Sequence, residues 1–232
     1  MDISRLQHTP FYCEENVYLL CKELCTNGTA DATGSDLFVA FISNEKKQVP
    51  LWNQKASKRA DGAILWDYHV ICVQRKNNGS PHLVWDLDSA LPFPSPLASY
   101  VSETIRPSFQ LFSEYQSLFT RFGPVALLPH CLLPFYEKIE FFRIVHAPVF
   151  LRCFASDRRH MKDSVGNWIA EPPAYEPIVA EDGTVHNLNE YIEIQASDAA
   201  KEFQGDLMND VNQKFGVLIN ENQIEEFFSK LS

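Results

Sequence analysis

A cysteine near the start of a predicted helix is the first residue of this 232-residue chain that could do chemistry. Cys13 is followed by four apolar residues at the i, i+3, i+4, i+7 spacing of an amphipathic helix: Val17, Leu20, Cys21 and Leu24. The unpaired backbone N–H groups of a helix's first turn carry partial positive charge, which favours a nucleophilic thiolate over the thiol. The charges of Glu14 and Glu15 oppose this effect, so a cationic partner must come from elsewhere in the chain.

A histidine and several acids lie on a predicted β-hairpin. Two runs of β-forming residues, 63–74 and 82–88, are separated by turn-forming residues. The twofold periodicity of a strand places His69 on the same face as Asp67. The second strand presents two acids on one face: Asp86 and Asp88.

The position of the turn determines which acid faces His69. A two-residue turn at 77–78 would pair His69 with Asp86, whereas a turn at 78–79 would pair it with Asp88. Asn-Gly is the stronger signal for a short turn, so turn chemistry favours Asp88. A longer loop would permit either register.

A thiol at a helix start, a strand histidine and an acid on the next strand are the groups of a thiol hydrolase. Such a set also arises by chance, and His69 could equally be a hydrogen-bonded histidine of the core. Glycoside hydrolysis by Asp86 and Asp88 is disfavoured, because nothing else in the sequence indicates an open sugar cleft. We expect no metal site, because Cys13, Cys21 and Cys25 lack CxxC spacing, and no glycine-rich phosphate loop is present.

The composition indicates a globular protein that stays inside the cell. Hydrophobic residues make up 45% of the chain, so one domain over residues 1–232 can bury a sizeable core. A formal net charge of -10 argues against a nucleic-acid partner. The N-terminus lacks the apolar core of a secretory signal, and the longest apolar run, 125–136, is shorter than the ~20 residues of a membrane span. We therefore expect no export and no membrane insertion.

The other predicted elements are strands and short helices. The continuous apolar run 37–42 predicts a strand that is covered on both faces and central in a sheet. Further strands are expected at 49–52 and 139–146. Helices are expected in five segments: 97–105, 107–122, 148–154, 187–194 and 222–231.

Five ordered strings are far more specific than a Cys-His pair. Through them the chain resembles the protein N-terminal glutamine amidohydrolase family: YCEENVYLLC (12–21), FISNEKKQVPLWNQKA (41–56), LWDYHV (65–70), VWDLDSALPFP (84–94) and FASDRRHMKD (154–163). The resemblance implies that Cys13, His69 and Asp86 form a catalytic triad. It also implies an α/β (α+β) fold with a papain- and transglutaminase-like core, in which an N-terminal catalytic helix packs on a mainly antiparallel sheet.

The resemblance further implies a reaction, the deamidation of N-terminal glutamine in proteins or peptides to glutamate with release of ammonia. The N-terminal glutamate would feed an N-degron pathway. Cys13 would attack the carboxamide carbon and His69 would transfer protons. Asp86 would stabilise the imidazolium, which would supply the missing cation. No cofactor is implied. The alternatives are a thiol peptidase or transglutaminase with the same triad, or a non-catalytic module that binds N-degrons.

A substrate with a free α-ammonium group requires acidic or carbonyl groups near the nucleophile. The candidates are four side chains: Tyr12, Asp67, Asp88 and Asp157. Residues 111–136 depart from the family pattern and are expected to be an insertion, and residues 195–232 a C-terminal helical extension. We expect a monomer in the cytoplasm, with the nucleus as a second compartment.

Overall fold

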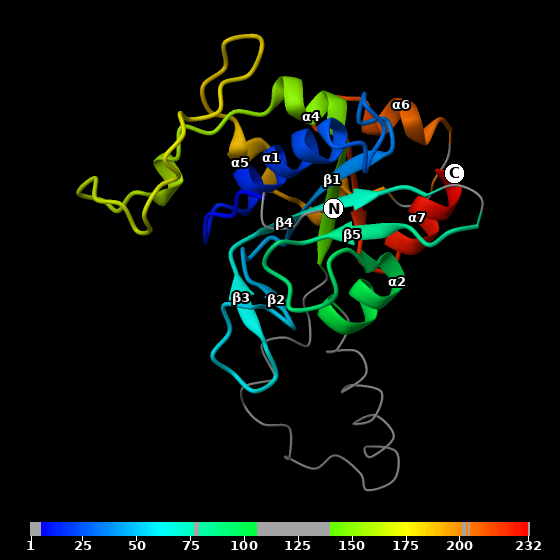
Figure 1. Cartoon of the computed structure of the whole chain (residues 1–232), viewed down its shortest axis with the longest axis horizontal. Helices are drawn as coiled ribbons and strands as arrows, with labels where there is room; N and C mark the ends of the chain where they lie inside the picture. Colours follow the sequence, from blue (N-terminus) through cyan, green and yellow to red (C-terminus); the bar gives the residue numbers. More distant parts are fainter. Residues whose placement is uncertain (1–5, 77–78, 106–139, 201–202, 204, 232) are drawn as a thin grey trace, which may run out of the picture.

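A six-stranded antiparallel sheet forms the centre of the molecule, in the order β6-β5-β4-β1-β7-β8 (Figure 1). The computed structural model describes residues 6–76, 79–105, 140–200, 203 and 205–231. The sheet contains β1 (Leu37–Ser43), β4 (His69–Gln74), β5 (Leu83–Trp85), β6 (Ser95–Pro96), β7 (Phe141–His146) and β8 (Val217–Asn220). The prediction of mixed helices and antiparallel sheet, an α+β fold, is confirmed.

The strand β1 occupies an internal position, as its continuous apolar sequence predicted. All of its residues are buried. Its side chains enter two separate cores, one on each face of the sheet: Leu37, Val39 and Phe41 on one, and Phe38, Ala40 and Ile42 on the other. Removing apolar side chains from water on both faces stabilises the sheet between two layers of helices.

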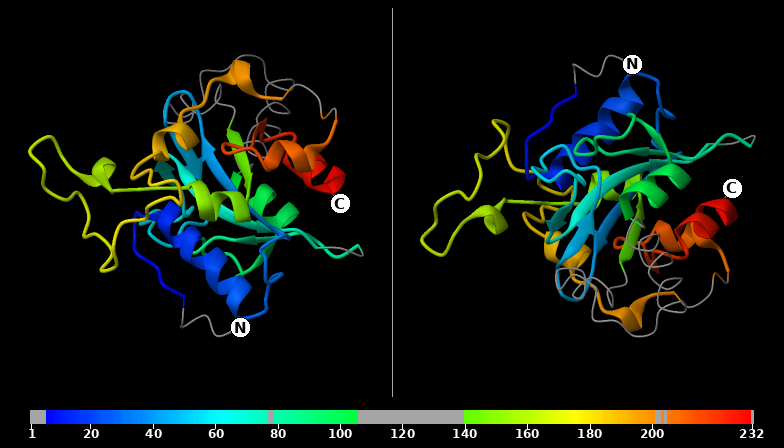
Figure 2. Two further views of the ribbon diagram at one scale, coloured as in Figure 1. Left: turned by 90° about the horizontal axis from the view of Figure 1, so that it is seen from above. Right: turned by 90° about the horizontal axis from the view of Figure 1, so that it is seen from below.

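Helices cover both faces of the sheet (Figures 1 and 2). One face packs against α1 (Cys13–Thr26), α4 (Ala147–Cys153) and α5 (Leu188–Ile192). The other packs against α2 (Leu97–Tyr100), the π-helical turn η2 (Val101–Ile105), α6 (Leu207–Val211) and α7 (Ile224–Lys230). Two 3-10 turns complete the helical elements of the described chain, η4 (Arg159–Met161) and η5 (Ala196–Asp198).

Four of the five expected helices are present in the structure. They correspond to α2 with η2, α4, α5 and α7. The fifth, expected at 107–122, lies outside the described residues, as does the expected insertion at 111–136. None of the helices in the described ranges has the length and apolar character that crossing a bilayer requires.

The run 63–74 is not the single strand that was expected. It forms β3 (Ile64–Trp66) and β4, and β3 pairs with β2 (Val49–Leu51) in a separate two-stranded sheet. The break falls at the exposed Asp67, whose Oδ1 accepts a hydrogen bond from the backbone N–H of Tyr68 at 3.0 Å. Such a local bond competes with the strand ladder. As a result, His69 is the first residue of a strand of the main sheet.

The C-terminal region differs from the helical extension that was expected. It contains η5, α6 and α7, but it also supplies β8, which pairs with β7 and forms an edge of the main sheet. The sequence Val-Leu-Ile-Asn of β8 is rich in β-forming residues. The described part of this region is therefore integrated with the sheet.

Candidate active site

Cys13 is the first residue of α1, as predicted, and its side chain is buried. Phe11, two residues earlier, has a left-handed backbone conformation with φ of 71°. Burial, followed by the charges of Glu14 and Asp88, raises the pKa of the Cys13 thiol well above its ordinary value. Burial and the two acids thus oppose the effect expected of the helix start, as the charges of Glu14 and Glu15 indicated in the sequence.

The Cys13 thiol lies against the beginning of β4. The backbone of Val70, the residue after His69, lowers the pKa of the thiol, which places the sulfur beside this strand. Its nearest side-chain hydrogen-bond contact is Oε2 of Glu14, 3.7 Å from Sγ. The first turn of α1 and the first residues of β4 thus form adjoining parts of one site.

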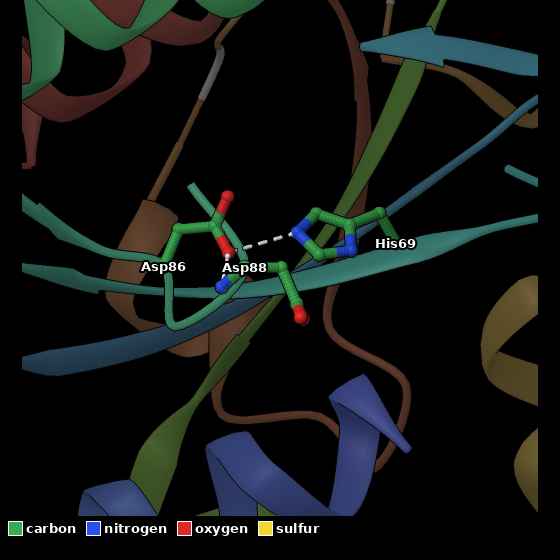
Figure 3. Close-up of side chains that lie close together, drawn as sticks. All are labelled: His69, Asp86 and Asp88. Carbon is green, nitrogen blue, oxygen red and sulfur yellow. Dashed lines mark hydrogen bonds and ion pairs between the residues drawn. The ribbon is translucent and has the colours of Figure 1, made fainter. Parts of the chain in front are cut away.

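His69 is fully buried, and its Nε2 lies 3.0 Å from Oδ1 of Asp86 (Figure 3). Asp86 also accepts hydrogen bonds from the Tyr100 hydroxyl at 2.8 Å and from the backbone N–H of Asp88 at 2.9 Å. Burial lowers the pKa of His69, but the charge and hydrogen bond of Asp86 and the charge of Asp88 together raise it above its ordinary value. Burial raises the pKa of Asp86, but its interactions with His69 and Tyr100 lower it overall. The pair therefore stabilises positive charge on the imidazole.

Asp86 determines which nitrogen of His69 is available for chemistry. An ionised carboxylate can only accept hydrogen bonds, so Nε2 must carry the proton of the neutral imidazole. Nδ1 is then an unprotonated acceptor, and it is buried without a hydrogen-bond partner among the described residues. Trp66 stacks on the ring with 5.3 Å between centroids and 25° between planes, which restricts its rotation. His69 thus offers a free basic nitrogen, as a general base requires.

The contact with Asp86 does not follow from the strand register. Cys72 pairs with Trp85, which is the register that an Asn-Gly turn predicts and that would place Asp88 opposite His69 if the strands continued. However, β5 ends at Trp85, and the chain turns at Asp86. In Figure 3 the Asp86 carboxylate reaches the imidazole, while the Asp88 side chain points in a different direction.

Glu14 and Glu15 are both fully buried, which the sequence did not indicate. Oε2 of Glu14 accepts a hydrogen bond from the Tyr68 hydroxyl at 2.9 Å. Oε1 of Glu14 lies 3.3 Å from Nε2 of His160 but has no partner with hydrogen-bond geometry in the described part of the chain. Glu14 therefore joins the first turn of α1 to the residue before β4 and to η4.

Glu15 forms a two-point ion pair with Arg158, which we call the Glu15–Arg158 clamp. Nε and Nη2 of Arg158 each donate a hydrogen bond of 2.9 Å to the carboxylate. Arg158 has a left-handed φ of 63° and also donates to the carbonyl of Pro173 at 3.1 Å. Burial raises the pKa of Glu15, although Arg158 opposes the shift. The clamp fixes the helix start to the loop after α4. The Arg158 guanidinium pairs with Glu15, so it is not the cationic partner of the Cys13 thiol.

Two of the four residues predicted to bind the substrate lie close to the nucleophile. The charges of Asp88 and Asp67 both raise the pKa of Cys13. Asp67 is exposed, whereas Asp88 is buried and its Oδ1 lies 2.8 Å from Nε2 of His8. The structure therefore brings these two acids to the site.

The other two candidates already have partners. The Tyr12 side chain is buried, and its hydroxyl donates to the carbonyl of Ala170 at 3.1 Å. Asp157 accepts a hydrogen bond of 2.9 Å from Nε of Arg159 and lies 3.2 Å from Nδ1 of His186. Asp157 is thus engaged in a separate charged cluster.

Trp66 and Tyr100 contact the candidate triad but were not among the predicted residues. Trp66 precedes His69 by three positions in the LWDYHV string, and Tyr100 falls in the helix expected at 97–105. No periodicity shows that their side chains reach His69 and Asp86, because both contacts depend on how separate elements pack. The one local signal was the presence of Trp66 in the same LWDYHV string as His69.

Three ligand atoms of His69, Asp86 and Asp88 lie within 4.8 Å of one another, a spacing that a metal ion could bridge. His69 and Asp86 are hydrogen-bonded to each other, and Asp88 is paired with His8. A metal ion would have to disrupt these contacts. The geometry fits an acid–base pair better than a metal site.

The chain was compared with known proteins. The model of a family described as N-terminal glutamine amidase matches residues 8–124 and 132–228. A relative from Arabidopsis thaliana, named Protein N-terminal glutamine amidohydrolase, is 60% identical over 233 residues, covering 100% of this chain and 95% of the relative. A relative of the same name from Oryza sativa subsp. indica is 52% identical, covering 100% of this chain and 90% of the relative. Another from Drosophila ananassae is 38% identical, covering 82% of this chain and 80% of the relative. The chain belongs to the N-terminal glutamine amidase family.

Proposed function

We propose that this protein hydrolyses the side-chain amide of N-terminal glutamine in proteins and peptides, giving N-terminal glutamate and ammonia. The observation that carries the proposal is the 3.0 Å contact between His69 and Asp86 beside the helix-borne Cys13, in a chain of this family. The shared name of the relatives describes the same reaction. The glutamate product would enter an N-degron pathway.

Cys13 is the proposed nucleophile. Nδ1 of His69 accepts the thiol proton as Sγ attacks the carboxamide carbon, which forms a tetrahedral intermediate with a negative oxygen. The backbone N–H of Cys13 is the proposed donor to that oxygen, because it belongs to the unpaired N–H groups of the helix start.

His69, now a cation, protonates the departing nitrogen, and the carbon–nitrogen bond breaks to release ammonia and leave a thioester on Cys13. A water molecule then gives a proton to His69 and attacks the thioester. The carbon–sulfur bond breaks, and the proton returns to the sulfur. Asp86, held by Tyr100, stabilises the imidazolium in both halves of the reaction. These steps involve no cofactor.

The proposal includes a papain- and transglutaminase-like core. Its support is the order of the three groups, with a cysteine on a helix, a histidine at the start of a strand and an aspartate after the next strand. We also propose one catalytic domain with an insertion at about residues 111–136 and a C-terminal extension from about residue 195. The family match omits residues 125–131, which fall inside the proposed insertion.

For its cellular setting, we propose a monomer that acts in the cytoplasm, with the nucleus as a second compartment. The proposed partners are protein or peptide substrates with N-terminal glutamine, and neither nucleic acid nor membranes. Size-exclusion chromatography with light scattering tests the monomer. Imaging of the tagged chain in cells tests the compartments.

A peptide panel separates this function from its alternatives. N-terminal glutamine peptides should gain about 1 Da and release one equivalent of ammonia, whereas a peptidase would shorten peptides and a transglutaminase would join them. A non-catalytic module would bind them without a mass change. The Cys13→Ala variant should lose turnover, while Cys25→Ala, on the same helix, should keep it. Full turnover by Cys13→Ala would contradict the proposal.

A further inference from the structure

The Asp88 carboxylate has an unusual partner for an acid beside a catalytic pair. Nε2 of His8 lies 2.8 Å from Oδ1 of Asp88. His8 belongs to the segment that leads into α1, and its side chain is 33% exposed, against 9% for Asp88. Among the described residues, His8 is the one side chain that hydrogen-bonds to this carboxylate. The buried Asp88 carboxylate is thus hydrogen-bonded to His8, a partly exposed side chain.

Asp88 is close enough to the reacting groups to contact a small substrate held there. Its carboxylate lies within 4.8 Å of ligand atoms of both His69 and Asp86. Its charge acts on Cys13 as well as on His69. In a glutamine residue, only two methylene groups separate the side-chain amide from the carbon that bears the α-ammonium group. A receptor for that ammonium must therefore lie in the immediate surroundings of the nucleophile.

Two other acids around the site, Asp86 and Glu15, are already held by buried partners. Asp86 is held by His69, Tyr100 and a backbone N–H. Glu15 is paired with Arg158. These partners are themselves buried, so displacing them would leave unpaired groups away from water.

Asp88 differs because its partner, the His8 side chain, is partly exposed and can move into solvent. Displacing His8 would expose no buried charge, since the imidazole is already partly solvated. A cation that replaced it would gain a charge-assisted hydrogen bond with a largely desolvated carboxylate. An α-ammonium group has the required charge and three donor hydrogens.

We propose that Asp88 binds the α-ammonium group of the substrate, and that His8 occupies this position in the free protein and is displaced when substrate binds. The inference rests on the proposed function, because it names the group that selects N-terminal glutamine. Glutamine inside a chain has no α-ammonium group, so the same contact excludes it.

Binding to an inactive protein tests the receptor directly. In a Cys13→Ala background, the dissociation constants of two peptides are measured by calorimetry: a glutamine peptide and the corresponding glutaramoyl peptide, which has hydrogen in place of the α-ammonium group. The free ammonium should improve binding about 10- to 100-fold. Adding Asp88→Asn should reduce this ratio to nearly 1, whereas adding Asp182→Asn, an exposed turn acid remote from the site, should preserve it. An unchanged ratio in the Asp88→Asn protein would overturn the proposal.

The His8→Ala variant of the active protein tests the displaced partner and does not alter the buried acid. Its KM for a glutamine peptide should fall by up to about fivefold, with kcat nearly constant. Its KM for the glutaramoyl peptide should not change. A higher KM for the glutamine peptide would show that His8 binds substrate, which overturns the displacement. If Asp88→Asn does not fold, this measurement still decides the question. A wild-type protein that deamidates no glutamine peptide contradicts the proposed function, whereas normal deamidation with an unchanged ratio contradicts this inference alone.

Discussion

Two buried polar networks meet at the first turn of α1, and they are built differently. In the network with β4 and β5, His69 binds Asp86, which is otherwise held by neutral donors, the Tyr100 hydroxyl and a backbone N–H. In the network with the loop after α4, Glu15 and Arg158 form a two-point ion pair. Both networks flank Cys13, one across β4 and the other along the helix.

The difference lies in what each network leaves available. His69 keeps a buried Nδ1 without a hydrogen-bond partner in the described structure, and both protonation states of its ring are compatible with the Asp86 contact. The Glu15–Arg158 clamp instead pairs a carboxylate with a guanidinium that does not lose its proton. The first network therefore leaves a buried acceptor that could take up a proton, whereas the second fixes two segments to each other. Four substitutions test this contrast.

Replacing the proposed base should have the largest effect. His69→Ala removes the group that takes the thiol proton, so kcat/KM for a glutamine peptide should fall by about 10,000-fold. The control is His82→Ala, because His82 accepts a hydrogen bond from the backbone of Lys76 elsewhere in the hairpin. A loss of less than tenfold in His69→Ala would place His69 outside the reaction.

Asp86→Asn should lower kcat/KM by about 100- to 10,000-fold, because an amide can hold the imidazole in the wrong tautomer. It should also change the pH profile. His69 accepts a proton only above its own pKa, so the wild-type acidic limb should lie above the ordinary value of about 6.5. Without the Asp86 charge that pKa falls, and the limb should move to lower pH. A limb that stays in place would show that Asp86 does not control His69.

Arg158→Met tests the clamp, and its main effect should be on stability. Removing one partner of a buried pair leaves an unpaired charge, so the free energy of unfolding in urea should fall by about 3 to 5 kcal/mol. The double variant Glu15→Leu/Arg158→Met should recover most of this loss. Activity measured where each protein is folded should change less than in Asp86→Asn. A larger loss of kcat than in Asp86→Asn would give Arg158 a direct part in the reaction.

Tyr100→Phe should have the smallest effect of the four. It removes one hydrogen bond from a neutral donor to the ionised Asp86, which corresponds to about 1.5 to 3 kcal/mol, or about a 10- to 150-fold loss in kcat/KM. Tyr191→Phe is the matched control, since Tyr191 is also buried and its hydroxyl donates to the carbonyl of Lys214. Equal kinetic losses in the two variants would remove Tyr100 from the site.

Local patterns predicted most of the described elements. The helix that begins at Cys13, the internal strand β1 and the helices α4 and α7 follow from apolar periodicity, which depends on neighbouring residues. The prediction of one strand over 63–74 was wrong for a local reason as well. The pattern shows β-forming residues but does not show that Asp67 interrupts the hydrogen-bond ladder. The C-terminal strand β8 was missed because its four residues lie between helical signals.

The partners of buried charges were not predictable in this way. Glu14 and Glu15 suit a helix start in solvent, and nothing in their sequence indicates that both are fully buried. The partner of Glu15 is 143 residues away, on a loop with a left-handed residue. The thiol pKa depends in the same way on the fold, since it is raised by burial, by the charge of Glu14 and by that of Asp88 in the turn after β5.

The sequence alone identified Cys13 at a helix start, a hairpin that carries His69, and two acids, Asp86 and Asp88, as its possible partners. It also indicated the correct register, because the turn signal and the alternation of side chains are local properties. The family resemblance selected Asp86, but only the folded chain shows its contact with His69 and pairs Asp88 with His8. The physical reason is that β5 ends at Trp85, so the side chains beyond it are directed by the turn and by Tyr100 rather than by the strand.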